Sequence, residues 1–304
     1  MSLLHKLSFI AFRAFDRVGV HVLPKHYYTP IADHHWLEEH KEAWTKRAPM
    51  TGVGWNLDEQ LAWLRATCEP FVNEVAGLKS YEKIVQSHVG PGYGPIESQA
   101  LHAVIRAKRP KNIVEIGSGV STAVMLEAVE ANVKDGFGAS RITCVEPFPK
   151  PAFRNIRGIT HVEEICQTVP ASTFEHLGEG DLLFIDSSHA LKTGSDVAAI
   201  YLHVVPALRP GVLIHIHDVW LPYLYSPLVL KGYFDWQETP LLLALLTNNP
   251  KLKVLAGLAA LQLDRESELR ALFPDFRSLP IKDGLALADL SHGHYVSSLW
   301  LQTL

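Results

Sequence analysis

Residues 112–122 constrain the fold of this chain more than any other segment. They read N-I-V-E-I-G-S-G-V-S-T, which is a short apolar stretch, an acidic residue, a glycine loop and small hydroxyl residues. Glycines let a backbone approach a ligand closely, and the start of a helix presents unpaired N–H groups to an anionic group. The segment therefore predicts a strand, a loop that holds a nucleotide-like cofactor, and a helix that begins at the loop.

Apolar strands and helices alternate around this loop. We expect helices at 96–108, 122–133, 151–157, 171–177 and 196–207, and strands at 112–116, 141–145, 159–162, 181–185 and 212–217, with late strands at 254–263 and 296–301. This alternation is typical of an α/β protein with a mostly parallel sheet and helices on both faces. The prediction is a Rossmann-like, seven-stranded sheet whose ligands gather beyond the carboxyl ends of its strands.

Composition narrows the class of protein. The chain has 304 residues, of which 47% are apolar and 20% charged, as in an ordinary soluble globular protein. The net charge of −4 gives no support for nucleic-acid binding. Three scattered cysteines predict neither a disulfide framework nor a cysteine-based zinc site, so we expect a reducing cytoplasm. No apolar run reaches the length of a membrane span.

The first part of the chain, residues 1–88, predicts a helical N-terminal extension that packs on a core domain of residues 89–304. Its first residues repeat apolar side chains at helical spacing, with Lys6, Arg13 and Arg17 between them. They lack the apolar core and small-residue cleavage site of a signal peptide. A helix on a membrane surface or in a dimer is an alternative, and packing on the chain's own domain is the favoured interpretation.

The residues around the glycine loop distinguish two classes of cofactor. A nicotinamide-binding fingerprint, G-x-G-x-x-G, needs a third glycine at the position that Thr122 occupies. Glu115 directly precedes the loop, where its charge would repel a pyrophosphate but would suit a cationic ligand. A nicotinamide-dependent oxidoreductase is therefore the alternative rather than the leading hypothesis for an enzyme.

The stretch V-E-I-G-S-G resembles motif I of the class I S-adenosylmethionine-dependent methyltransferases. The resemblance implies that the cofactor is bound by Glu115, Gly117, Ser118, Gly119, Ser121 and Thr122. It also implies that Glu146, at the end of the next strand, accepts hydrogen bonds from both ribose hydroxyls, a task that suits a carboxylate.

Further ordered motifs extend the resemblance over residues 88–304. The segments Y-G-P-I-E-S-Q-A-L, V-E-I-G-S-G-V-S-T, I-D-S-S-H and S-L-W-L are similar to the family 24 methyltransferases, which include antibiotic-sugar O-methyltransferases and are related to catechol-type ones. The resemblance implies O-methylation of a small molecule. It also suggests that Tyr93 and Glu97 close over the methionine part of the cofactor, with Glu97 reaching its ammonium group. A helix N-terminal acid favoured by the macrodipole is an equally good interpretation of Glu97.

Acids and histidines follow two strands that we expect to be neighbours. Asp186 ends one of them, and His217 and Asp218 end the other. Neighbouring strands lie about 4.8 Å apart, so these side chains can share one divalent metal. The resemblance implies a metal site at the three residues, although His217 stands where the relatives usually have an acid. An imidazole ligand shifts the preference from magnesium toward manganese, iron or zinc, and loss of the metal is the alternative.

His189, three residues after Asp186, is the candidate general base, because the antibiotic-sugar relatives carry a similarly placed histidine that takes the acceptor proton. A positioned base contributes roughly 10²–10⁴-fold, and a divalent cation lowers the pKa of a hydroxyl. Asp186 and His189 would then face the acceptor. Because His217 is unusual at this position, a third hypothesis is that the protein keeps the methyltransferase fold but catalyses no reaction. The sequence leaves open which acceptor is used and whether the chain forms a homo-oligomer.

Overall fold

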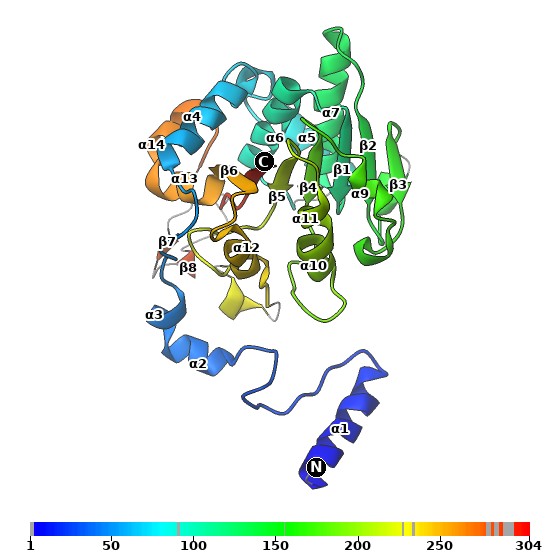
Figure 1. Ribbon diagram of the computed structural model, residues 1–304, viewed down its shortest axis with the longest axis vertical. Helices are drawn as coiled ribbons and strands as arrows, with labels where there is room; N and C mark the ends of the chain where they lie inside the picture. The colour runs from blue at the N-terminus through cyan, green and yellow to red at the C-terminus, as the bar shows by residue number, and fades with distance from the viewer. Residues whose placement is uncertain are drawn as a thin grey trace.

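The computed structural model describes residues 3–89, 92–154, 156–226, 228–232, 235–277, 281–282, 286–287 and 295–304. A seven-stranded sheet in the order β3-β2-β1-β4-β5-β9-β6 lies at its centre (Figure 1). The strands are β1 (Asn112–Ile116), β2 (Arg141–Val145), β3 (Ile159–Val162), β4 (Leu182–Ile185), β5 (Leu213–Ile216), β6 (Leu252–Gly257) and β9 (Leu299–Thr303). Strand β9 runs antiparallel to β5 and β6, and the other neighbours are parallel. The predicted mostly parallel, Rossmann-like sheet is confirmed.

Successive residues of the central strands enter two different cores. Ile113 of β1 and Leu182 of β4 belong to the apolar cluster on one face, and Val114 and Leu183 belong to the cluster on the other face. Side chains of a strand alternate between the two faces of its sheet, so a strand covered on both sides must be apolar at every position. Burial of the central strands on both faces of the sheet therefore explains why their sequences are apolar at successive positions.

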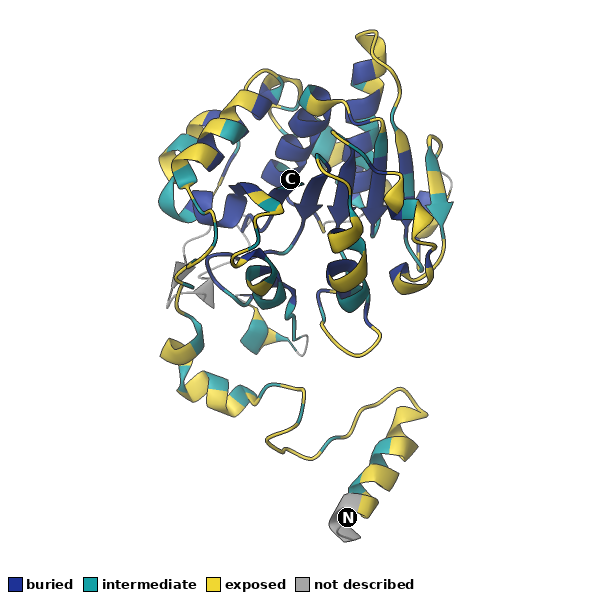
Figure 2. Ribbon diagram, in the orientation of Figure 1, coloured by how far each residue is buried: buried dark blue, intermediate teal, exposed yellow. Residues whose placement is uncertain are grey.

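Helices cover both faces (Figures 1 and 2). One cluster contains residues of α4 (Leu57–Cys68), α5 (Lys79–Ile84), α6 (Pro95–Lys108), α7 (Val120–Lys134), α13 (Leu258–Asp264) and α14 (Glu266–Leu272). The opposite cluster contains residues of α9 (Ser172–Glu175), α10 (Asp196–Ala199), the π-helical turn η4 (Ile200–Val204), α11 (Val205–Ala207) and α12 (Glu238–Leu246). The elements α10, η4 and α11 follow one another without a break and make up the predicted helix 196–207.

Shorter elements complete the described chain. They are α8 (Pro151–Arg154), the turns η1 (Val72–Glu74), η2 (Val85–Val89), η3 (Cys166–Thr168) and η5 (Val229–Lys231), and the two-stranded pair of β7 (Ile281–Lys282) and β8 (Ala286–Leu287). Residue 155, inside the predicted helix 151–157, lies outside the described residues.

The strand order reverses between β1 and β4. The chain proceeds from β1 outward to β2 and β3, and then returns to the other side of β1 to form β4 and β5. Ligands of open α/β sheets bind in the crevice beyond the carboxyl ends of the strands at such a reversal. The loop after β1 and the residues after β4 and β5 therefore occupy the expected binding edge.

The predicted strand 254–263 is wrong in its second half. Strand β6 ends at Gly257, and the next residues form helix α13. A buried apolar run does not reveal by periodicity alone whether it is a strand or a helix. Gly257 lies where the strand gives way to the helix. A Cβ atom at this position would lie 2.8 Å from the ring of Trp55, so the close packing there favours glycine.

The N-terminal residues divide into a part on the core and a part away from it. Helices α4 and α5 contribute buried residues to the core, whereas α1 (Leu3–Asp16) lies apart from the sheet, and α2 (His34–Glu39) and α3 (Lys41–Trp44) carry no buried residue (Figures 1 and 2). The boundary between residues 1–88 and 89–304 stays a prediction. Within the described ranges, no helix is long and apolar enough to cross a membrane.

Candidate active site

The loop after β1 is held against the end of β4. Gly117 has a φ of 96°, and a Cβ atom at this position would collide with the carbonyl oxygen of Asp186. Its amide donates to the carbonyl of Val145, so the parallel ladder continues one residue beyond the strands. The close approach and the positive φ both require glycine here. Ser118 and Gly119 follow, half-buried, at the start of the 15-residue helix α7.

Glu115 lies behind this loop with all of its side chain buried. Its carboxylate accepts hydrogen bonds from Ser121 Oγ at 2.6 Å, Thr122 Oγ1 at 2.7 Å and Cys144 Sγ at 3.0 Å. Burial raises the pKa of Glu115 to about 7, although the three hydrogen bonds act in the opposite direction. The carboxylate thus joins β1 and β2 to the first turn of α7 and fixes the shape of the loop. Direct contact of Glu115 with a cofactor stays a prediction.

Glu146 lies one residue past β2, beside the loop. Its amide donates to the carbonyl of Val162, and its Oε1 atom accepts from the amide of Phe148 at 2.7 Å. The side chain is half-buried. It therefore stands at the next strand end along the binding edge, where the sequence predicted a ribose-binding carboxylate.

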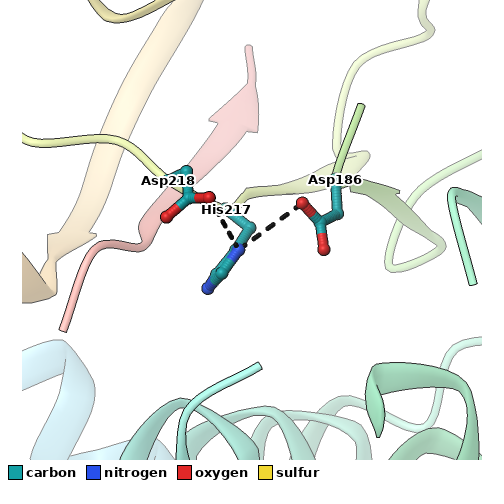
Figure 3. Close-up of side chains that lie close together, drawn as sticks. All are labelled: Asp186, His217 and Asp218. Atoms are coloured by element: carbon teal, nitrogen blue, oxygen red, sulfur yellow. Dashed lines mark ion pairs between the residues drawn. The ribbon is translucent and has the colours of Figure 1, made fainter. Parts of the chain in front are cut away.

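Asp186, His217 and Asp218 converge beyond β4 and β5 (Figure 3). Ile185 pairs with Ile216 in the parallel ladder, so the next residues leave the two strands at the same level. One ligand atom from each of the three side chains lies within 4.8 Å of the other two. The Nδ1 atom of His217 is 3.5 Å from Oδ1 of Asp186 and 3.8 Å from Oδ2 of Asp218. The residues predicted to share a metal are therefore together.

His189 joins the same group from the segment after β4. Its Nε2 atom lies 3.3 Å from Oδ1 of Asp186 and 3.6 Å from Oδ2 of Asp218. Its Nδ1 atom donates to Glu238 Oε2 at 2.6 Å, and Glu238 Oε1 accepts from Tyr201 at 2.7 Å. The imidazole is thereby oriented with Nε2 toward the two aspartates.

Two of these residues have unusual backbone conformations. The φ of His189 is 57° and that of Asp218 is 55°, in the left-handed region that residues other than glycine rarely adopt. Such conformations persist only where the surrounding structure holds them, and they cluster at functional sites. The unusual backbone conformations at His189 and Asp218 therefore mark the turns after β4 and β5 as part of a functional site.

Glu97 and Tyr93 lie under the site. Glu97 is fully buried in α6; its Oε1 atom accepts from the amide of Ser297 at 2.9 Å and from Ser298 Oγ at 2.7 Å, and its Oε2 atom lies 3.4 Å from Nε2 of His217. The hydroxyl of Tyr93 lies 3.0 Å from Nε2 of His215. Glu97 thus supports His217, and the roles predicted for Glu97 and Tyr93 at the cofactor stay predictions.

The charges in the site interact strongly. Burial acts to lower the pKa of His189, but Asp186 and Glu238 outweigh it and raise that pKa to about 10. The pKa of His217 is likewise raised by Asp218, Glu97 and Asp186 against the effect of burial. Burial would raise the pKa of Asp186, yet the two histidines hold it well below its usual range. A cation, either protons on the histidines or a metal, belongs among these carboxylates.

His215 behaves differently from His217 although both come from β5. It is fully buried, and its ring stacks on Phe184 with 4.4 Å between centroids. Burial lowers the pKa of His215 to about 3, so the ring is neutral. His215 is therefore a packed core histidine.

Sequence reasoning missed Glu238 and Tyr201. Glu238 is 49 residues from its partner His189, and as the first residue of α12 it looks like any acid at a helix start. Trp236 packs its ring 4.7 Å from that of His189. No local motif signals these partners, because only the packing of α10, η4 and α12 on the sheet brings them together.

Comparison with known proteins agrees with this geometry. Residues 114–219 match the family model described as "Methyltransferase domain", methyltransferase family 24. Together with the strand order and the glycine loop, the match defines a class I S-adenosylmethionine-dependent methyltransferase domain. The match covers about a third of the chain, and this segment is similar to family 24. No curated protein matches the sequence at a significant level.

Several solved structures are similar to this chain at low sequence identity. The methyltransferase PaMTH1 of Podospora anserina, bound to S-adenosylhomocysteine (SAH), is 17% identical over 94% of this chain and 99% of its own, with a TM-score of 0.41. An SAH-bound O-methyltransferase from Bacillus cereus is 14% identical over 79% of this chain and 100% of its own, with a TM-score of 0.47. The O-methyltransferase TomG of Streptomyces achromogenes is 13% identical over 81% and 98%, with a TM-score of 0.44. These similarities do not assign a substrate to this chain.

Proposed function

We propose that this protein transfers the methyl group of S-adenosylmethionine to a hydroxyl group of a small molecule. The observation that carries the proposal is the convergence of Asp186, His189, His217 and Asp218 beside the glycine loop at Gly117. Methyl transfer needs an acceptor held in line with the sulfonium and a group that helps the acceptor lose its proton. The glycine loop and the next strand end would bind the cofactor, and the cluster of acids and histidines would bind the acceptor and help it lose its proton.

The cofactor half is the loop and the next strand end. Gly117, Ser118 and Gly119 would bind the cofactor along their backbone, with Ser121, Thr122 and Glu115 fixing the loop beneath it. Glu146 would accept the hydrogen bonds of the ribose diol. A half-buried carboxylate one strand away from the glycine loop supports this assignment.

The acceptor half contains a donor set that fits a divalent metal. The Nδ1 atom of His217 is buried and has no hydrogen-bond partner among the described residues, and it points at Asp186 and Asp218 (Figure 3). A buried polar atom without a partner is costly unless a ligand satisfies it. Asp186, His217 and Asp218 would hold the metal, which when bound lowers the pKa of an acceptor hydroxyl.

The surroundings of His189 suit an acceptor with an apolar or ring-shaped body. Trp236 packs against His189, and Trp220, Tyr223 and Tyr295 form an aromatic cluster to which Trp236 belongs at its edge. Aromatic faces bind rings and apolar groups, and the charged residues beneath them would orient the hydroxyl. Asp186 and His189 would face that hydroxyl.

Location and the class of acceptor are further parts of the proposal. The three cysteines are free and buried, which supports a reducing cytoplasm as the site of action. The net charge of −4 favours a small-molecule acceptor over nucleic acid.

Calorimetry with SAH tests the cofactor half. We expect a dissociation constant in the micromolar range or tighter, as is usual for such a ligand. Glu146→Ala should weaken binding at least about tenfold, since a charge-assisted hydrogen bond contributes about 1.5–3 kcal/mol. The matched control is Glu130→Ala, an exposed acid on α7 that should leave binding unchanged. No SAH binding by the wild-type protein would exclude the proposed function.

A panel of hydroxyl acceptors then tests turnover. Formation of SAH with one acceptor class and none without acceptor supports the enzyme hypothesis. SAH binding without methylation of any acceptor, with or without divalent metals, would instead support a protein that keeps the fold without turnover.

A further inference from the structure

We infer that His189 is a metal ligand and that the site binds one transition-metal ion through two imidazoles and two carboxylates. The four ligand atoms are Nε2 of His189, Nδ1 of His217 and one oxygen each of Asp186 and Asp218. The inference rests on the metal site of the proposed function and adds a fourth residue to it.

Four of the six distances between these atoms are close to those between ligands of a tetrahedral ion. Each histidine nitrogen faces both carboxylate oxygens, at 3.3 and 3.6 Å for His189 and at 3.5 and 3.8 Å for His217. Ligands about 2.0–2.1 Å from a tetrahedral zinc ion lie about 3.3–3.4 Å from one another. Adjacent ligands about 2.1 Å from an octahedral magnesium ion lie about 3.0 Å apart. The four nitrogen–oxygen distances are therefore nearer to the spacing of tetrahedral ligands than to that of octahedral ligands.

Both imidazoles are held from behind by a buried carboxylate. Glu238, 1% exposed, accepts from Nδ1 of His189, and Glu97, which is fully buried, lies 3.4 Å from Nε2 of His217. Metal-bound histidines almost always donate their second ring N–H to such a group, which fixes the tautomer and directs the other nitrogen to the metal. Two histidines with this arrangement, facing the same two carboxylates, define one centre.

The buried, unpartnered nitrogen of His217 is a second and independent observation that supports a cation site. Nδ1 of His217 is buried and makes no hydrogen bond within the described part of the chain, although two carboxylate oxygens lie within 3.8 Å. The nitrogen of His217 lies within ion-pair distance of the two carboxylate oxygens but makes no hydrogen bond with them. We expect this geometry when the nitrogen lone pair and both oxygens point toward one shared ion rather than toward each other.

The ligand role of His189 changes its chemistry. Its Nδ1 atom is committed to Glu238, and a metal-bound Nε2 atom has no lone pair left for the proton of an acceptor. His189 is then a ligand rather than the general base that the sequence predicted. A set of two imidazoles and two carboxylates favours zinc, iron or manganese over magnesium, which prefers oxygen ligands.

Metal titration of the metal-free full-length protein tests the inference without any measurement of activity. We expect one equivalent of Zn²⁺ to bind, with Mg²⁺ at least about 100-fold weaker. Co²⁺ in the same site should give the intense visible absorption of a tetrahedral ion. His189→Gln should lower zinc affinity at least about 100-fold, and Glu238→Gln about 10- to 100-fold. The matched control, His176→Gln, changes an exposed histidine at the end of α9 and should have no effect.

Three results would overturn the inference: no stoichiometric metal binding, unchanged zinc affinity in His189→Gln, or a Co²⁺ spectrum of octahedral type. Unchanged affinity together with lost turnover in His189→Gln would restore the base role. SAH calorimetry on the same samples tests the proposed function separately, because the residues that would bind the cofactor are not among the four metal ligands. Wild-type protein that binds SAH but no metal contradicts only this inference.

A different part of the chain carries a second inference: we infer that α1 binds the surface of an anionic membrane. Leu7, Ile10 and Phe15 are 55%, 63% and 46% exposed and lie on one side of the helix, whereas Phe9, which is 56% exposed, lies on another side. Lys6 and Arg13 lie beside that side of the helix at a spacing of seven residues, and Arg17 follows one residue after the end of α1. An apolar side edged by basic residues is the pattern of a helix that lies in a membrane interface.

Charge and position support a lipid partner. Residues 1–33 contain four basic and two acidic residues, a net charge of +2, whereas the whole chain carries −4. Figures 1 and 2 show α1 apart from the sheet with most of its surface exposed. Tyr27 and Tyr28, farther along the same segment, are 92% and 82% exposed, and tyrosine is favoured at the level of lipid headgroups. A second copy of the helix would bring like charges together.

Co-sedimentation with lipid vesicles tests this second inference. The full-length protein should bind vesicles of 70% phosphatidylcholine and 30% phosphatidylglycerol, bind pure phosphatidylcholine vesicles at least about tenfold less, and dissociate at high salt. The double variant Leu7→Ser, Ile10→Ser should lose binding. Leu202→Ser, which changes a side chain that is 59% exposed on η4, is the control. Equal binding by the double variant, or dimerisation through α1 without vesicle binding, would refute the inference.

Discussion

The Nδ1 atom of His189 donates a hydrogen bond of 2.6 Å to Oε2 of Glu238, a residue 49 positions later in the chain. Glu238 is almost fully buried, and its other oxygen accepts from Tyr201. The pair fixes which ring nitrogen of His189 faces Asp186 and Asp218. Orientation by a buried carboxylate serves a metal ligand and a general base equally, so the pair marks His189 as functional in either role.

Replacement of Glu238 by glutamine should therefore reduce kcat about 10- to 100-fold, the usual effect of losing such a partner. The SAH dissociation constant should remain within about twofold of the wild-type value, because the cofactor half is separate. Tyr201→Phe should have a smaller effect on kcat, since it removes one neutral partner of Glu238. Steady-state kinetics and calorimetry on the same preparations give both numbers, and equal kcat values in wild type and Glu238→Gln would contradict the prediction.

Gly117→Ala should disrupt the loop. The new Cβ atom meets the carbonyl of Asp186, and the φ of 96° is unfavourable for alanine. We expect a loss of about 1–3 kcal/mol or more in the free energy of unfolding, with weaker SAH binding. Gly136→Ala is the control for backbone strain alone, since its φ is 86° but nothing lies within 4 Å of the added atom. Denaturant unfolding that finds the two variants equally stable would argue against the close contact.

Arg106 should stabilise the helical layer without affecting the site. Its side chain is 6% exposed, and its Nε and Nη2 atoms donate to both oxygens of Glu74 at 2.7 and 2.8 Å. Arg106→Met should lower the free energy of unfolding by about 2–3 kcal/mol, somewhat less than for a fully buried pair, because Glu74 is partly exposed. SAH binding should be unchanged.

The control for this loss is Arg270→Met. Arg270 pairs with Glu266 at the surface, where an ion pair contributes about 0.5 kcal/mol or less. If both arginine variants lose the same stability in chemical denaturation, the buried network around Arg106 is not the stabilising feature.

The metal-free protein should lose stability as the pH rises above 6.5. In the folded state the pKa of His189 is about 10, whereas the unfolded value is about 6.5. The folded state therefore holds the proton more tightly, and the resulting stability is fully present below pH 6.5 and is lost as the pH approaches 10. The slope is at most about 1.4 kcal/mol per pH unit for this one group. Unfolding curves at pH 6.5, 8 and 9.5 measure it.

The variant His189→Gln should lack this part of the slope, and saturating Zn²⁺ should suppress it in the wild type because metal replaces the proton. Metal affinity should in turn increase with pH, since each bound histidine must first lose its proton. An identical slope in His189→Gln and wild type would assign the pH dependence to other groups.

Local patterns of residues predicted the sheet, the glycine loop and the residues at the strand ends. Ile113 and Val114 are both buried because a two-sided sheet needs apolar residues at successive positions, and this signal is local. Gly117 and the three residues Asp186, His217 and Asp218 follow strands directly, so the parallel ladder alone brings them to one edge. Local periodicity failed at 258–263, where a buried helix and a buried strand look alike.

The orientation of the two histidines depends on contacts between segments that are far apart in the sequence. Glu97 reaches His217 across 120 residues, and Glu238 reaches His189 from a helix whose position no nearby motif predicts. These contacts depend on how α6 and α12 pack against opposite faces of the sheet. Packing of distant segments is the sum of many weak apolar contacts rather than a property of any short stretch of sequence. The residues of the site could therefore be predicted, whereas the carboxylates that aim them could not.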